Sequence, residues 1–380
     1  MYFHIILTEK CNSKCKYCYE KSLQEFDNKL GEKFKFDFSA PSKSEIKIEN
    51  LKKFIRKDPY AKIIFYGGEP LVNQKKLIEI MDGLNKLENL EYFIQTNGKL
   101  LNELPEKYVN QFKKILVSIN GTEKRTDFNR GQKTYDTILK NLKLIKKNNF
   151  NGEIIARMTI SPSISPESYD LLKQIKHLFF ETNNSFDSIH WQLDMGFYKS
   201  DFDEEKISKF VYDYNKEITR LLNYWLEKMK SGIVLKLYPF MGIFESLYYN
   251  KPSKLRCGSG YINYTITTNG KITCCPIMNS IKDFYVGNIR DSNPNTLKKI
   301  FVSEPCISCK YLDICGGRCL YSNKAKLWPP EEQDLICKTV IHLIEEIKRI
   351  LPKIKELIKQ DIISEEHFFY EKYFGPEIIP

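Results

Sequence analysis

The 380-residue sequence lacks the features typical of membrane, secreted and repetitive proteins. No apolar run reaches the roughly 18 residues that a membrane-spanning helix needs, and no tract is of low complexity. The first eight residues have neither the basic flank nor the small-residue cleavage site of a secretion signal. We therefore expect a soluble, globular, cytoplasmic protein that does not enter a membrane.

Charge of either sign is not concentrated in one segment. The formal net charge is +11, and the lysines are spread over most of the segments with helical patterns. Such a distribution is explained by lysines and glutamates on the solvent-exposed faces of helices. We therefore expect no nucleic-acid partner, and the charge alone does not identify a substrate.

Cysteine is the residue type present in unusual number, with eleven copies. Cytosolic thiols are kept reduced, so cysteines there serve metal binding or catalysis more often than disulfides. A chain of this length builds its core without a metal staple. The cysteines therefore indicate functional metal.

Strand-like segments alternate six times with helical patterns in the first 200 residues. Apolar residues at three- and four-residue spacing predict helices at 71–87, 134–147 and 166–180. This alternation predicts an α/β fold, a partial (β/α)6 TIM-like barrel of parallel strands whose carboxyl ends meet at one mouth. The predicted strands are 2–8, 62–66, 91–96, 114–120, 154–160 and 188–195.

The alternation stops after about residue 200 and a different region follows. A long helical pattern covers 204–230, and closely spaced cysteines begin at Cys257. We predict a barrel over 1–231, a linker over 232–256, a cysteine-rich domain over 257–340 and a helical tail over 341–380.

Cys11, Cys15 and Cys18 follow the first strand, with three and then two residues between them. This spacing lets three thiolates bind three corners of one cubane iron-sulfur cluster, which leaves the fourth iron open to a small molecule. The motif, with Tyr17 before its last cysteine, resembles that of the radical S-adenosylmethionine (SAM) superfamily. A structural zinc site is the alternative, although such sites usually pair two cysteines with two ligands farther along the chain.

The resemblance implies contacts to SAM from residues that follow later strands. It assigns the turn after the second strand to the methionyl amine, polar residues after the third and fourth strands to the ribose, and Arg157 to the carboxylate. Asn120 departs from the family, which often has an acid there. Without the resemblance, the turn is an ordinary Gly-Gly turn and Arg157 a structural ion pair. The implied contacts are Tyr17, Gly67, Gly68, Glu69, Pro70, Thr96, Asn97, Ser118, Asn120 and Arg157.

Gln192 and Asp194 end the sixth strand and point to the same side of it, because they are two residues apart. We predict that they line the substrate chamber as catalytic residues. The alternative is a polar pair at the rim of the barrel.

A second cysteine pattern starts at Cys257, continues with Gly270 and Cys275, and ends in a Cys-x2-Cys-x5-Cys-x3-Cys string and a last cysteine. It resembles the SPASM domain of peptide-modifying radical SAM enzymes. The resemblance implies two auxiliary clusters, whose ligands are Cys306, Cys309, Cys315 and Cys337 for one and Cys257, Cys275 and Cys319 for the other.

The second set lacks a fourth matched cysteine, so its last iron is either open to substrate, bound by another side chain or bound by Cys274. Two zinc ribbons are the alternative for the whole region, because Cys306-x2-Cys309 is also a zinc spacing.

The resemblances together imply an enzyme with three 4Fe-4S clusters and SAM that forms a 5'-deoxyadenosyl radical. They imply a ribosomally made peptide or protein as substrate, modified by a thioether, a carbon-carbon bond or side-chain oxidation, and a one-electron donor such as ferredoxin or flavodoxin. No separate leader-binding domain is expected, so the charged insert at 20–44 or a separate protein would recognise a leader.

Two alternative functions remain. One is an anaerobic sulfatase-maturing, formylglycine-generating enzyme, a family that has a catalytic Asp where this chain has Pro276. The other is a non-enzymatic iron-sulfur or zinc protein.

Overall fold

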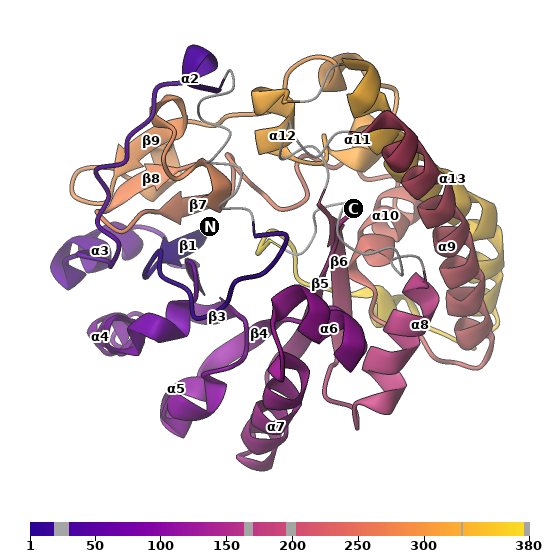
Figure 1. The fold of residues 1–380 in the computed structure, drawn as a ribbon, viewed down its shortest axis with the longest axis horizontal. Helices are drawn as coiled ribbons and strands as arrows, with labels where there is room; N and C mark the ends of the chain where they lie inside the picture. Colours follow the sequence, from indigo (N-terminus) through magenta and orange to yellow (C-terminus); the bar gives the residue numbers. More distant parts are fainter. Residues whose placement is uncertain (19–29, 163–169, 195–202, 328–329, 376–380) are drawn as a thin grey trace.

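The computed structural model describes residues 1–18, 30–162, 170–194, 203–327 and 330–375. Part of the insert at 20–44, the start of the helix predicted at 166–180 and the last residue of the strand predicted at 188–195 lie outside these ranges. Strands curve around a central space, and most helices lie outside them (Figure 1).

The described strands form one sheet in the order β6-β5-β4-β3-β2-β1-β7-β8-β9. Neighbours from β6 to β7 are parallel, while β7, β8 and β9 form an antiparallel meander. The predicted partial barrel is confirmed. The strands are β1 (Tyr2–Ile6), β2 (Lys62–Tyr66), β3 (Glu91–Thr96), β4 (Phe112–Ser118), β5 (Glu153–Ile160), β6 (Ser188–Leu193), β7 (Asn263–Ile266), β8 (Lys271–Thr273) and β9 (Tyr285–Asn288).

Helices cross over between successive barrel strands. The described helices are α2 (Leu30–Lys33), α3 (Ile48–Ile55), α4 (Gln74–Leu84), α5 (Glu106–Val109), α6 (Glu123–Arg130), α7 (Thr134–Lys147), α8 (Leu171–Lys176), α9 (Glu204–Lys230), α10 (Tyr238–Tyr248), α11 (Leu312–Cys315), α12 (Leu320–Ala325) and α13 (Pro330–Lys359). None of them is long and apolar enough to cross a membrane, within the residues that the structure describes.

The predicted segments and the observed ones agree closely. The helices predicted at 134–147 and 204–230 coincide with α7 and α9, and the strands predicted at 62–66 and 91–96 coincide with β2 and β3. The segment predicted at 71–87 divides into a 3-10 turn, Pro70–Asn73, followed by α4. The segment 232–256, predicted as a linker, contains the largely buried α10.

Side chains on the barrel strands alternate between two packed regions. Phe3 and Ile5 of β1 belong to the large core under the helices, whereas Tyr2 belongs to a small cluster inside the barrel. This alternation follows from the two-residue period of a strand. The inner cluster comprises Tyr2, Ile64, Phe93, Leu116, Ile155, Tyr238 and Phe374.

Phe374 reaches this inner cluster from the segment after α13. Its side chain is fully buried, and its ring centroid lies 5.6 Å from that of Phe93 and 5.8 Å from that of Tyr238. Glu371 of the same segment accepts a hydrogen bond from Tyr2 Oη at 3.0 Å and pairs with Lys62 Nζ at 2.5 Å. The segment thus closes the barrel below its mouth, and in Figure 1 it runs as a yellow trace within the ring of strands.

Replacement of Phe374 by Ala is expected to destabilise the protein by about 3–5 kcal/mol, because it removes a buried ring and leaves a cavity inside the barrel. Phe369, in the same segment but 62% exposed, is the matched control. Phe369→Ala should change stability by no more than about 0.5 kcal/mol. Urea unfolding followed by fluorescence measures both, and equal effects would contradict the assignment.

Candidate active site

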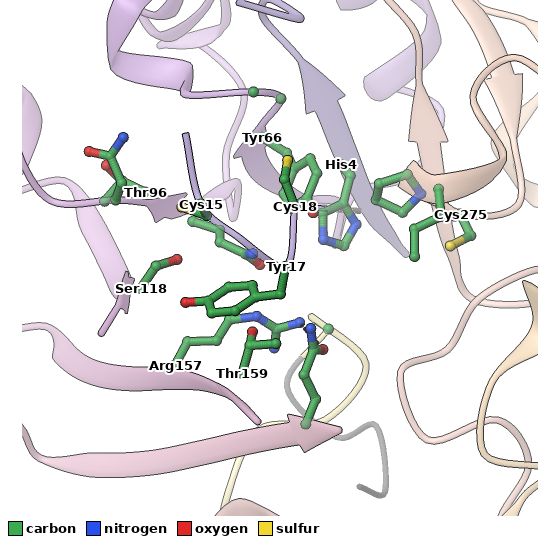
Figure 2. Close-up of a pocket in the computed structure, with 18 of the residues that line it drawn as sticks. His4, Cys15, Tyr17, Cys18, Tyr66, Thr96, Ser118, Arg157, Thr159 and Cys275 are labelled. Carbon is green, nitrogen blue, oxygen red and sulfur yellow. Dashed lines mark hydrogen bonds between the residues drawn. The ribbon is translucent and has the colours of Figure 1, made fainter. Parts of the chain in front are cut away.

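One cavity opens at the carboxyl ends of the barrel strands, where the sequence predicts the site. Thiols from both cysteine motifs line it, together with a carboxylate and an amide from the end of the last barrel strand. Figure 2 shows Cys15, Cys18 and Cys275 around the same space. The predicted site residues that line the cavity are Cys11, Cys15, Tyr17, Cys18, Gly67, Gly68, Glu69, Thr96, Asn97, Ser118, Arg157, Gln192, Asp194, Cys257, Cys275 and Cys319.

The first thiol group is surrounded by nitrogen donors. Arg130 Nη1 lies 3.7 Å from Cys15 Sγ, and Asn97 Nδ2 lies 4.0 Å from Cys11 Sγ. Burial raises the pKa of the Cys11 thiol to about 11, so iron must displace its proton on binding. Donors aimed at sulfur stabilise the resulting thiolate, and the three thiols therefore fit a cluster with three protein ligands.

Gly67 and Gly68 bring the turn after β2 against the chain that leads to Cys11. A Cβ on Gly67, whose φ is +143°, would lie 2.2 Å from the Thr8 carbonyl oxygen, and one on Gly68 would lie 2.5 Å from that of Glu9. Gly68 N–H donates to the Thr8 carbonyl at 2.8 Å. The sequence interpretation explained these glycines by a ligand, and the structure adds close backbone packing as a reason.

The Glu69 carboxylate is buried at the cavity wall with both oxygens hydrogen bonded. Oε1 accepts from Thr96 Oγ1 at 2.7 Å and from Leu71 N–H at 3.0 Å, while Oε2 accepts from Asn97 N–H at 2.7 Å. Burial raises the pKa of Glu69 to about 6, and these hydrogen bonds oppose the rise. Pro70, which is buried beside it, does not line the cavity but opens the following turn.

Asn120 is fully buried and is not among the residues that line the cavity. Its Oδ1 accepts from Tyr17 Oη and from Arg130 Nε, the latter at 2.8 Å, and its Nδ2 donates to the Thr159 carbonyl at 2.7 Å. Its polar groups are thus used within the protein, and it positions Tyr17 and Arg130.

Arg130 lines the cavity at the end of α6, and the sequence interpretation missed it. That interpretation considered residues directly after each strand, whereas α6 begins several residues after β4. The position of this helix after a barrel strand was the signal that its polar residues could reach the barrel mouth. The sequence interpretation also missed His4 of β1 and Asn263 of β7. Both line the cavity, and His4 Nδ1 lies 2.9 Å from Asn263 Oδ1.

Arg157 lies on the inner face of β5 with no carboxylate as a hydrogen-bond partner. Its Nη2 donates to Gln192 Oε1 at 2.8 Å, and its Nη1 lies 3.1 Å from His190 Nδ1. Burial lowers the pKa of Arg157. The structural ion pair, the alternative considered from the sequence, is not present among the described residues. Figure 2 shows Arg157 beside Tyr17 and Thr159.

Among the remaining thiols, some lie near enough to one another to affect each other's pKa. Burial raises the pKa of Cys337 to about 12, and the nearby Cys315 and Cys306 thiols add to the rise. Burial also raises the pKa of Cys275, and the thiols of Cys319, Cys257 and the adjacent Cys274 add to the rise. Cys309 belongs with Cys306, whose pKa burial raises to about 11 with contributions from Cys315 and Cys309.

Cys274 faces away from these groups. It is 1% exposed in the hydrophobic core, and its Sγ donates to the Phe284 carbonyl at 3.6 Å, whereas the adjacent Cys275 lines the cavity. Burial raises the pKa of Cys274 to about 12. Successive residues of an extended chain point in opposite directions, so Cys274 is a core residue here.

No three His, Cys, Asp or Glu side chains are grouped tightly enough to bind a single metal ion, as far as the described residues go. Ligands of a cubane cluster bind different iron atoms and stand farther apart than those of one ion. The wider grouping of thiols therefore does not count against clusters.

Comparison with protein families matches residues 5–175 to the Radical SAM superfamily. This chain is a radical SAM enzyme. The match begins within β1 and ends within α8, so it includes the first three cysteines and Glu69 but not β6. SAM and a 4Fe-4S cluster are the typical cofactors of a radical SAM enzyme.

Curated relatives extend the similarity beyond the barrel. The cysteine-type anaerobic sulfatase-maturating enzyme of Clostridium perfringens (strain 13 / Type A) is 24% identical over 86% of this chain and 89% of its own length. The radical SAM cyclopropyl synthase TigE of Paramaledivibacter caminithermalis is 25% identical over 94% of this chain and 75% of its own.

Solved structures share the fold of both regions. Native anSMEcpe with bound AdoMet matches with a TM-score of 0.71 at 19% identity, covering 95% of this chain and 99% of its own. Streptococcus suis SuiB bound to the precursor peptide SuiA matches with a TM-score of 0.55 at 14% identity, covering 85% of this chain and 72% of its own. The cysteine-rich region thus has the fold of the corresponding part of anSMEcpe.

SAM binding to this radical SAM enzyme should weaken as the pH falls through about 6, the pKa of Glu69. We expect the ionised carboxylate to attract the methionyl ammonium group, so that its protonation below that pH should cost up to about tenfold in affinity per pH unit. Anaerobic calorimetric titration with SAM measures this dependence.

Glu69→Gln should bind SAM weakly and without this pH dependence, because the amide does not ionise. Glu106→Gln, at an exposed position of α5, is the control and should keep the dependence of the parent. An unchanged pH profile in Glu69→Gln would rule out this role for the carboxylate.

Proposed function

We propose that this enzyme cleaves SAM to form a 5'-deoxyadenosyl radical and uses it to modify a ribosomally made peptide or protein, with two auxiliary 4Fe-4S clusters beside the first. One observation carries the proposal. Thiols of the radical SAM motif and of the Cys257, Cys275 and Cys319 group line one cavity. A substrate in this cavity lies between the source of the radical and a second redox centre.

The barrel residues bind and orient the cofactor in this proposal. Cys11, Cys15 and Cys18 hold a cluster that, when bound, supplies the electron for SAM cleavage. Glu69 receives the methionyl ammonium, and Arg157 or Arg130 receives the carboxylate. Tyr17, held by Asn120, closes the wall beside them, while the groups after β3 and β4 contact the ribose through Thr96, Asn97 and Ser118.

The substrate side of the cavity supports a net two-electron oxidation. Hydrogen-atom transfer to the 5'-deoxyadenosyl radical removes one electron and one proton, and a new bond then requires loss of a second electron and a second proton. Asp194 is the cavity carboxylate that can take the proton, with Gln192 beside Arg157 orienting the substrate. The electron leaves through the auxiliary region to a one-electron protein partner such as ferredoxin or flavodoxin.

A peptide as substrate is supported by the relatives. SuiB has been solved with its precursor peptide SuiA, and anSMEcpe with the Cp18Cys peptide. In this chain the domains that act together are the barrel of 1–231 and the cysteine-rich part of 257–340, with α10 packed against β6 between them.

Sulfatase maturation is the second candidate because the Clostridium perfringens enzymes match over most of both chains. The wall of the cavity argues against it. Pro276 lines the cavity directly after Cys275, where the sulfatase-maturing family has a catalytic Asp. A proline has no group that can accept a proton, so thioether, carbon-carbon or other side-chain oxidation is the better supported chemistry.

Anaerobically purified enzyme should contain about twelve irons per chain, four for each cluster. Replacing Cys11, Cys15 and Cys18 together by Ala should leave about eight irons and abolish 5'-deoxyadenosine formation. Iron analysis and chromatography of the reaction measure both. Stoichiometric zinc, or 5'-deoxyadenosine from the triple variant, would contradict the proposal.

The neighbouring cysteines 274 and 275 offer a matched pair. Cys275→Ala should lose about four irons, because its thiol is a ligand in the cavity wall, whereas Cys274→Ala should keep about twelve. The paramagnetic resonance spectrum of Cys274→Ala should equal that of the parent. Iron loss from Cys274→Ala alone would show that the ligand assignment is reversed.

A further inference from the structure

Arg318 lies in a tight turn between two predicted cluster ligands, Cys315 and Cys319. Gly316, Gly317 and Arg318 have φ values of +74°, +91° and +48°, so three successive residues adopt the left-handed region. Only glycine does so at low cost, and a left-handed arginine indicates a conformation that its surroundings impose.

This turn directs its backbone N–H groups toward sulfur. The Cys315 thiol accepts hydrogen bonds from the N–H groups of Gly317 and Arg318, which partly offset the rise that burial causes in its pKa. Successive N–H groups in such a turn form a concave site for anions. The N–H groups of this turn thus face the Cys315 sulfur.

The Arg318 side chain is buried with most of its donors unused. It is 8% exposed, its Nε and Nη1 have no hydrogen-bond partner among the described residues, and its Nη2 is 3.5 Å from the Leu193 carbonyl oxygen. A buried guanidinium with unused donors is costly, because hydrogen bonds do not fully replace the water that the charge has lost. The site therefore requires an anion that completes it.

The nearby groups indicate which anion this is. Among the charges acting on the Cys315 and Cys337 thiols is that of Arg318, whereas those acting on the Cys275 thiol come from Cys319, Cys257 and Cys274. Cys315 ends α11 and Cys337 lies on α13, and Lys348 Nζ of α13 lies 5.4 Å from the ring centroid of Tyr311, directly before α11. The guanidinium thus lies close enough to act on two thiols of the group of Cys306, Cys309, Cys315 and Cys337.

We propose that Arg318 is a positioning residue for the auxiliary cluster of Cys306, Cys309, Cys315 and Cys337, to which its unused N–H groups donate, and that it raises the reduction potential of that cluster. The inference rests on the proposed function, which supplies the cluster. A four-thiolate cluster carries net negative charge, and reduction makes it more negative. A positive charge and hydrogen bonds to sulfur stabilise the reduced form more than the oxidised one.

Arg318 also connects this cluster to the wall of the cavity. Its Nη2 approaches the carbonyl of Leu193, the residue before Asp194, which lines the cavity. A higher potential at the outer cluster favours transfer of the electron away from the cavity. The same guanidinium therefore ties the end of β6 to the route by which the electron leaves.

The test is a redox titration followed by paramagnetic resonance, in protein whose Cys11, Cys15 and Cys18 are replaced by Ala to remove the first cluster's signal. Arg318→Met, which has neither the charge nor the donors, should lower the potential of one auxiliary cluster and leave the other unchanged. Arg318→Gln, a neutral donor, should give a smaller shift in the same direction. Arg290→Met, at an exposed position, is the control and should shift neither potential.

Each outcome decides the proposal. Unchanged potentials in Arg318→Met and Arg318→Gln, with both auxiliary clusters present, would overturn it. Loss of every cluster would also overturn it, because Arg318 would then have a general role in folding. Selective loss of about four irons from either variant supports it, because the guanidinium then holds that one cluster. Fewer than about eight irons before Arg318 is changed would instead mark failure of the proposed function itself.

Discussion

Strand β1 is the element on which the rest of the structure depends, because it pairs in parallel with strands on both sides. Tyr2 is opposite Lys62 of β2 on one side and opposite Asn263 of β7 on the other. The barrel and the cysteine-rich region therefore share one sheet. Their relative position is fixed by backbone hydrogen bonds, which hold regardless of the side chains that line the cavity between them.

This shared sheet explains why two cysteine motifs about 240 residues apart in the sequence face one cavity. Cys11 follows β1 directly, and Cys275 follows β8 in the meander that β1 recruits through β7. Gly67 and Gly68 add a second constraint, since they press the turn of Glu69 onto the chain before Cys11. The two sets of thiols are thus fixed to the same framework.

The fold could be predicted from the sequence, and the contacts of the supporting polar residues could not. Apolar runs and turn residues indicate where strands end. The spacing of cysteines indicates which thiols can bind one cluster. Asn120 follows a strand as expected, but its amide oxygen accepts hydrogen bonds from Tyr17 and Arg130. The contact with Arg130 depends on how α6 packs against the barrel. That Cys274 and Cys275 point in opposite directions follows from their adjacency, but which of the two enters the core depends on the packing around them.

The burial of Phe374 inside the barrel has a consequence for how the molecule is made. The inner cluster needs Tyr2 from the first strand and Phe374 from the end of the described chain, so its contacts span almost the whole sequence. Contacts of such long range form late, because loop-closure entropy is lost before they stabilise the chain. During synthesis on a ribosome, the six barrel strands emerge long before the side chain that fills their interior. The interior of the barrel therefore stays unfilled until nearly the whole described chain has been made.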